Sequence, residues 1–132
     1  MTRHLLIALA MAIPSTIRAQ DSLPVACDSA MTTIDMRRCD SRDLESAQRD
    51  LQRYLQEARR VAANRAQLDS SQVAWLRYRD VACRAAASEY EGGTMQPLVV
   101  LGCLTDLTRD RIRQLYNGHL RTSDTALPEP KP

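Results

Sequence analysis

The 132-residue sequence contains no phenylalanine, and its aromatic residues are one tryptophan and four tyrosines. A hydrophobic core must therefore be built mainly from aliphatic side chains. The sequence also has no charge excess after its first 19 residues, because that leader holds two basic residues and no acidic one, and the rest has 16 of each. This balance argues against a nucleic-acid-binding domain, which would carry an excess of basic residues. The remaining chain of about 113 residues is enough for one small domain.

Long apolar runs are absent as well. Leu5 to Ile13 is a nine-residue apolar stretch between Arg3-His4 and Pro14, which is typical of a secretory signal and too short to span a bilayer. We predict a signal peptide over residues 1–19 and a periplasmic or secreted protein without a membrane span. A buried core helix is one alternative for this stretch. Acylation of Cys27 is another, but Cys27 lies fourteen residues beyond the apolar stretch, too far for a compact lipoprotein signal.

Four cysteines remain after the leader: Cys27, Cys39, Cys83 and Cys103. An even number in a small exported chain predicts two disulfides. Zinc is the competing interpretation, but the spacing contains no CxxC pair, and His119 is the one histidine outside the leader. We therefore predict no metal site.

The first predicted helix runs from Thr32 or Thr33, whose hydroxyl suits an N-cap, to about Asn64 without proline or glycine. Apolar residues recur along it at steps of three and four, which is the pattern of one buried stripe. They are Leu44, Ala47, Leu51, Tyr54, Ala58 and Val61. Leu51 and Tyr54 are therefore predicted core residues.

A second helix is predicted from caps at Asp69-Ser70-Ser71 to about Tyr90, where Gly92-Gly93 follows. Its apolar positions are Leu68, Trp75, Tyr78, Ala82, Ala86 and Tyr90. Trp75 and Tyr78 are accordingly predicted to lie in the core. A third helix is predicted from Pro97, which suits a first turn, to Asn117-Gly118. Its apolar stripe is Leu101, Leu104, Thr108, Ile112 and Leu115.

These patterns predict an all-α fold of three helices in antiparallel up-down-up order. Residues 20–31 form an extended lead-in, residues 32–118 the helical domain, and the proline-rich residues 119–132 a disordered tail. Cys83 lies about seven residues before the glycine turn and Cys103 about six after it, so each lies roughly 10 Å from the turn along its helix. We therefore predict the disulfides Cys83–Cys103 and Cys27–Cys39.

The ordered set of motifs resembles the lysozyme inhibitor LprI N-terminal family of small exported bacterial proteins, over roughly residues 27–116. The residues that carry the resemblance are Cys27, Thr32, Cys39, Leu51, Tyr54, Gln72 to Asp80, Cys83, Tyr90, Gly92 to Thr94, Cys103, and Leu107-Thr108 with Arg111. Gln52 departs from the asparagine usual in the family. The resemblance implies a protein that binds and inhibits lysozyme and so protects peptidoglycan. The alternative is an envelope interaction module with another extracellular or periplasmic protein as its partner.

No arrangement in the sequence indicates catalysis. His119 stands alone, the cysteines are expected to be paired, and no glycine-rich phosphate loop is present. We predict neither an enzyme nor a cofactor.

Two places are candidate partner contacts. Arg79 is one, because arginine is a common interface anchor, although the simpler interpretation is that it pairs with a carboxylate or caps backbone carbonyls. The other is the loop from Glu91 to Gln96, which could also act as nothing more than a helix stop. A lysozyme cleft contains two catalytic carboxyls. Thr94 and Gln96 could donate hydrogen bonds to them, and Met95 could pack on the cleft wall.

Overall fold

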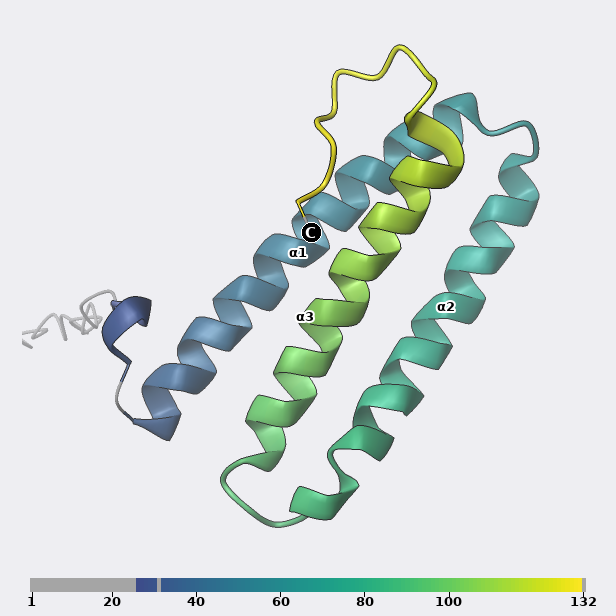
Figure 1. The fold of residues 1–132 in the computed structure, drawn as a ribbon. Coiled ribbons are helices and arrows are strands. Elements are labelled where there is room, and N and C mark those ends of the chain that lie inside the picture. The colour runs from purple at the N-terminus through teal and green to yellow at the C-terminus, as the bar shows by residue number, and fades with distance from the viewer. Residues whose placement is uncertain (1–25, 31, 132) are drawn as a thin grey trace, which may run out of the picture.

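The structure, a computed structural model, describes residues 26–30 and 32–131. Three long helices run antiparallel in sequence order: α1 (Thr33–Val61), α2 (Arg65–Ala86) and α3 (Gln96–Leu115) (Figure 1). Short turns accompany them, η1 (Cys27–Ser29), η2 (Ser88–Tyr90) and the π-helical η3 (Tyr116–Leu120). The predicted all-α, up-down-up fold is confirmed. The predicted signal peptide and the first part of the lead-in lie outside the described residues, and the part that is described forms η1 instead of extended chain.

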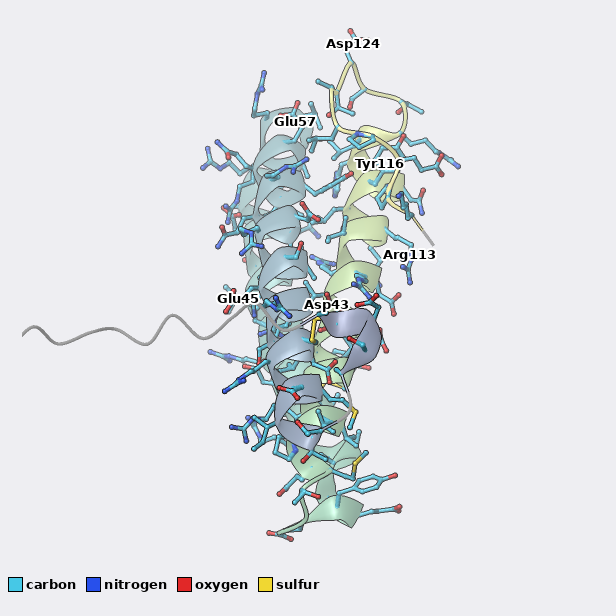
Figure 2. All side chains as sticks on the ribbon, turned by 90° about the vertical axis from the view of Figure 1, so that its left-hand side faces the viewer. Asp43, Glu45, Glu57, Arg113, Tyr116 and Asp124 are labelled. Atoms are coloured by element: carbon cyan, nitrogen blue, oxygen red, sulfur yellow. A yellow bond between two sulfur atoms is a disulfide. The ribbon has the colours of Figure 1, made fainter. Side chains whose placement is uncertain are left out.

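Helix α3 is the central element of the domain. It lies between α1 and α2 in Figure 1, packs most extensively on α1 and less on α2, whereas α1 and α2 have little contact with each other. Because α1 and α3 run parallel, their C-terminal ends meet, and Figure 2 shows Glu57 and Tyr116 toward the same end of the molecule. None of the helices within residues 26–30 and 32–131 is long and apolar enough to cross a membrane.

Helix α1 begins as the sequence predicts. The Thr32 Oγ1 accepts a hydrogen bond from the Asp35 backbone N–H at 3.1 Å and donates one to the Asp35 carboxylate at 2.7 Å. This cap satisfies one of the backbone donors left open at a helix start. Buried residues follow at the predicted spacing: Cys39, Leu44, Ala47, Leu51, Tyr54, Leu55 and Ala58. Val61, the last residue of the helix, is 44% exposed and so lies outside the stripe.

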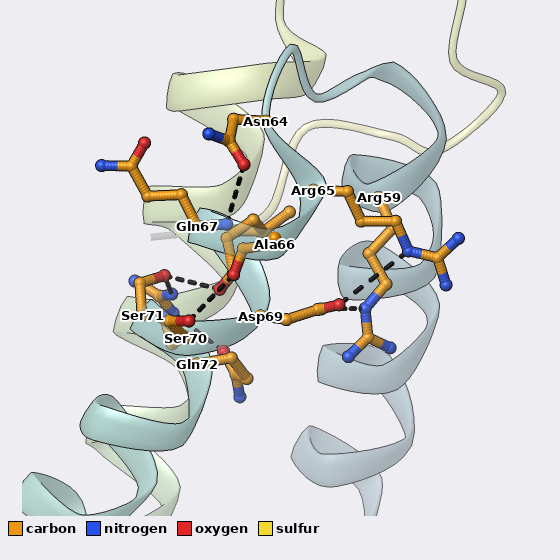
Figure 3. Close-up of polar contacts among 11 residues, drawn as sticks. Arg59, Asn64, Arg65, Ala66, Gln67, Asp69, Ser70, Ser71 and Gln72 are labelled. Atoms are coloured by element: carbon orange, nitrogen blue, oxygen red, sulfur yellow. Dashed lines mark hydrogen bonds and ion pairs between the residues drawn. The ribbon is translucent and has the colours of Figure 1, made fainter.

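Helix α2 begins earlier than predicted. The Asn64 side-chain oxygen accepts from the Gln67 backbone N–H at 3.0 Å, so Asn64 is the cap (Figure 3). Ser70 and Ser71, which we expected to cap the helix, lie inside it. Their hydroxyls donate to backbone carbonyls one turn back, at 2.9 and 2.7 Å. That internal bonding is how a helix accommodates serine, and it explains why the cap prediction was wrong.

The turn between α2 and α3 contains the predicted glycine and proline signals, but the helix before it ends earlier than predicted. Helix α2 ends at Ala86, four residues before the predicted end at Tyr90, and η2 continues the chain. Gly92 has φ +74°, a conformation that favours glycine because it lacks a Cβ. Pro97 lies in the first turn of α3, as predicted.

The C-terminal part of the chain differs from the sequence prediction. Asn117-Gly118 does not end the helix, because the chain continues through η3 to Leu120, which is fully buried. Residues 121–131 then turn back toward α1 (Figure 1). Leu127 packs against the core, and the Tyr54 hydroxyl donates to the Pro128 carbonyl at 2.5 Å. The Leu127 side chain and the Pro128 carbonyl thus hold residues 121–131 against the helices, although the composition of this segment predicted disorder.

The main core cluster lies at the end of the molecule where α1 meets η3. Its buried members are Leu51, Tyr54, Leu55, Ala58, Leu68, Ile112, Leu115 and Leu120. The predicted core positions Leu51 and Tyr54 are confirmed, and Trp75 is partly buried against the cluster. The prediction for Tyr78 was wrong, since Tyr78 is 60% exposed. At about 100° per residue, position 78 is rotated about 60° from Trp75, away from the neighbouring helices.

Both predicted disulfides are present. Cys83–Cys103 joins α2 to α3 with a Cα–Cα distance of 5.5 Å, and Cys27–Cys39 joins η1 to α1 at 5.7 Å. Acylation of Cys27 would require the sulfur that the structure pairs with Cys39. Among residues 26–30 and 32–131, no group of three or more histidine, cysteine or acidic residues could hold a metal ion.

Candidate functional site

A group of polar side chains surrounds Trp75, between α2 and α3. The guanidinium carbon of Arg79 lies 5.2 Å from the centroid of the indole ring, and that of Arg111 lies 5.9 Å from it. Both distances are within the range of a cation–π interaction, which contributes about 0.5–1 kcal/mol at an exposed site. The tryptophan thus contacts a cation from its own helix and another from α3.

Arg111 ties α3 to the first half of α2. Its Nε donates to the Gln72 side-chain oxygen at 3.1 Å, and one Nη donates to the Ser71 hydroxyl at 2.9 Å. Gln72 is 5% exposed, so the bond from Arg111 satisfies an amide that would otherwise be costly to bury. Burial lowers the pKa of Arg111 below its ordinary value, which still leaves an arginine charged. These contacts hold the two helices in register.

Arg79 is enclosed more than a surface arginine. Its side chain is 12% exposed, forms an ion pair with Asp80 at 3.0 Å and lies 3.4 Å from the fully buried Thr108 hydroxyl. This geometry supports the packing role that the sequence left open. A direct contact between Arg79 and a partner protein stays a prediction.

A groove separates α1 from α2 next to this cluster. It encloses about 540 Å³ and is lined on the α1 side by Leu51 and Leu55, and on the α2 side by Gln72 and Arg79. Val73 and Leu76, which are 53% and 38% exposed, also line it. The groove exists because α3 alone bridges the two helices along most of their length.

The tip loop, residues 91–96, lies at the opposite end of the molecule from the turn between α1 and α2 (Figure 1). Thr94 is exposed and Met95 is 46% exposed. The Gln96 side-chain oxygen accepts from the Gly92 backbone N–H at 3.3 Å, so its NH₂ group is the part that can donate outward. The loop stands on a rigid base, because the Cys83–Cys103 disulfide joins the two helices just behind it.

The structure therefore separates the predicted contact residues into two places. Thr94, Met95 and Gln96 lie together in the tip loop, whereas Arg79 lies in the helix interface. The sequence reasoning missed the partnership of Arg111 with Gln72 across that interface. A signal was present, since residues 72, 75 and 79 share one helix face by spacing, as do 108 and 111. The sequence did not show that these two helix faces pack against each other.

The fold and the cysteine pairing define a small α-helical domain with two intramolecular disulfides. Residues 26–115 match the family model described as Lysozyme inhibitor LprI, and the chain belongs to this family. An uncharacterized protein of Rhizobium meliloti (strain 1021) is 48% identical over 48 residues, which make up 36% of this chain and 34% of that protein. The chain thus matches about a third of the length of this curated relative. No solved structure matches the chain.

The matching family is described by an inhibitory role, and that description names no catalysed reaction. The disulfides are consistent with an extracellular or periplasmic location, where an oxidising environment preserves them.

Proposed function

We propose that this protein is exported, binds lysozyme and inhibits it without chemical turnover, and so protects peptidoglycan. The observation that carries the proposal is the family match over residues 26–115, which includes all of α1, α2 and α3, and both disulfides. The matched region is thus the folded domain itself. An inhibitor needs only a rigid complementary surface, which a domain of this kind supplies.

The tip loop is the proposed contact. Thr94 and the NH₂ group of Gln96 are donors that suit the carboxyls of a lysozyme cleft, and the exposed Met95 suits its wall. Because the nearby disulfide and the Gln96–Gly92 bond already order the loop, little conformational entropy is lost when it binds. Preorganisation of this kind is what allows a short loop to bind tightly.

Local charge also supports this end as the contact surface. Glu91 is the first residue of the loop, Glu89 lies just before it, and both are exposed. Many lysozymes are basic, so two carboxylates at the tip favour encounter in the correct orientation even though the whole domain is nearly neutral.

The test is the rate of lysis of a peptidoglycan suspension by chicken-type, goose-type and invertebrate-type lysozymes, with and without the purified domain. The double variant Thr94→Ala/Met95→Ala should weaken inhibition while leaving the melting temperature nearly unchanged, because both side chains are exposed. The matched control is Val61→Ala/Thr122→Ala, which removes an apolar and a hydroxyl side chain at the other end and should inhibit normally. Full inhibition by the tip-loop variant would reject this contact surface.

The alternative function is an envelope interaction module with another protein partner. The exposed Val73 and Leu76 in the groove between α1 and α2 favour it. If the native domain fails to inhibit all three classes of lysozyme, the inhibitor proposal fails and this alternative replaces it.

A further inference from the structure

The domain has almost no net charge, but its basic and acidic residues are unevenly distributed along its length. We divide it into a loop end, residues 26–48 and 77–108, and a tail end, residues 49–76 and 109–131. The loop end has 6 basic and 9 acidic residues, whereas the tail end has 10 basic and 6 acidic residues. The two ends therefore carry opposite net charge, and the tail end has four positive charges in excess. The overall balance of the sequence conceals this separation because α1, α2 and α3 each contribute to both ends.

A depression at the tail end concentrates the positive charge. It encloses about 710 Å³ where α1 ends and α2 begins, and its rim carries Arg59, Arg60 and Arg65. The amides of Gln52 and Gln56 line the same depression. All five of these groups can donate hydrogen bonds.

The carboxylates near the depression neutralise only part of this charge. Arg59 and Arg65 approach one shared carboxylate, that of Asp69, at 2.6 and 3.9 Å, and Figure 3 shows both guanidinium groups on the same side of Asp69. Arg60 pairs with Glu57 at 3.1 Å. Three guanidinium groups thus face two carboxylates. The Arg60 and Arg65 side chains are 73% and 70% exposed, so their planar donor forks can reach a ligand outside the protein.

We propose that the tail end docks on an anionic phospholipid surface, with a headgroup phosphate in the depression formed by Arg59, Arg60 and Arg65. Guanidinium groups match the geometry of phosphate oxygens and bind them through paired hydrogen bonds. The charge excess extends over the whole tail end, which fits a surface that carries many phosphates better than one isolated phosphate. Binding of this kind is electrostatic, so salt weakens it.

The docking has a consequence for the inhibitor. With the tail end on the membrane surface, the tip loop points away from it, toward the space where lysozyme acts. This consequence rests on the proposed function, whereas the docking itself does not depend on lysozyme.

The experiment measures sedimentation of the mature protein with vesicles of phosphatidylglycerol mixed into phosphatidylcholine, and with vesicles of phosphatidylcholine alone. We expect binding to the anionic vesicles at about 50 mM salt and its loss at about 500 mM, where the screening length becomes only a few ångströms. Arg60→Gln/Arg65→Gln should lower the affinity on the order of tenfold or more. The matched control, Arg77→Gln/Arg84→Gln, removes two charges from exposed positions of α2 at the loop end and should bind like the native protein.

Three results would overturn the proposal. The first is no binding to anionic vesicles at low salt. The second is an equal loss in both double variants, which would indicate diffuse attraction and no site. The third is calorimetric binding of inorganic phosphate without vesicle binding, which would indicate a site for a free phosphate. Circular dichroism melting checks that each variant is folded. The lysis assay, run without vesicles, should give native inhibition for both double variants, so failure of the docking and failure of the inhibitor function are distinguishable.

Discussion

The two interfaces of α3, with α1 and with α2, are formed by different kinds of side chains. Toward α1, α3 presents aliphatic residues such as Ile112 and Leu115, which pack with Leu51 and Ala58 in the main core. Toward α2, it presents Thr108, Arg111 and the Cys103 disulfide. The first interface is stabilised by burial of apolar surface, and the second by a covalent bond, hydrogen bonds and contacts of arginines with an indole ring. The polar motif residues therefore hold α2 in place against α3.

The largest effect is expected at the apolar interface. Leu115 is 1% exposed, so Leu115→Ala removes buried methyl groups and leaves a cavity that should cost about 3–4 kcal/mol of unfolding free energy. Denaturant titration followed by circular dichroism measures this loss. A cost below about 1 kcal/mol would show that the α1–α3 contact is not the main source of stability.

An intermediate effect is expected at the polar interface. Trp75 is only partly buried, so Trp75→Ala should cost about 2–3 kcal/mol, less than a fully buried aromatic residue. Tyr78→Ala, one turn away on the same helix and 60% exposed, is the control and should change stability by less than about 0.5 kcal/mol. Equal costs for the two variants would contradict the placement of the indole between Arg79 and Arg111.

The smallest effect is expected where the C-terminal segment meets α1. Tyr54→Phe keeps the ring and removes the hydrogen bond to the Pro128 carbonyl, which should cost about 1 kcal/mol. Residues 121–131 should then be released more often, so trypsin should cleave faster after the exposed Arg121. Unchanged cleavage would mean that this bond does not hold the segment. Burial raises the pKa of the Tyr54 hydroxyl above its ordinary value; the charge of Arg53 opposes this shift, whereas Asp50 and Tyr116 add to it.

The helices and disulfides could be predicted because the features that indicate them lie close together along the sequence. A stripe at steps of three and four, a threonine cap at Thr32 and a proline at Pro97 each report on a few neighbouring residues. The pairing of Cys83 with Cys103 needed only the distance of each from one turn. Helix bounds were less accurate, because Asn64 and Ser71 are both plausible caps and only the completed helix decides between them.

The candidate sites were predictable in part. The tip loop was identified from Gly92-Gly93 followed by Thr94, and the structure shows this segment at the tip of the helical hairpin. The environment of Arg79 was not predictable, because its ion pair and its contact with Thr108 depend on how α3 is rotated against α2. The exposure of Tyr78 was not predictable either, because its spacing matches the apolar positions of α2 whereas its side chain faces solvent.

The sequence by itself determined the helical class, the order of the three helices and the cysteine pairs, since periodicity, caps and turn lengths are properties of adjacent residues. The tertiary structure alone decided that α3 is central and that Arg111 reaches Gln72. It also decided that Leu127 and Pro128 return to α1, and that opposite charges collect at the two ends. The physical reason is that burial, hydrogen bonding and charge act between residues that are close in space, and the spacing of residues along the chain does not specify how one helix is rotated against the next.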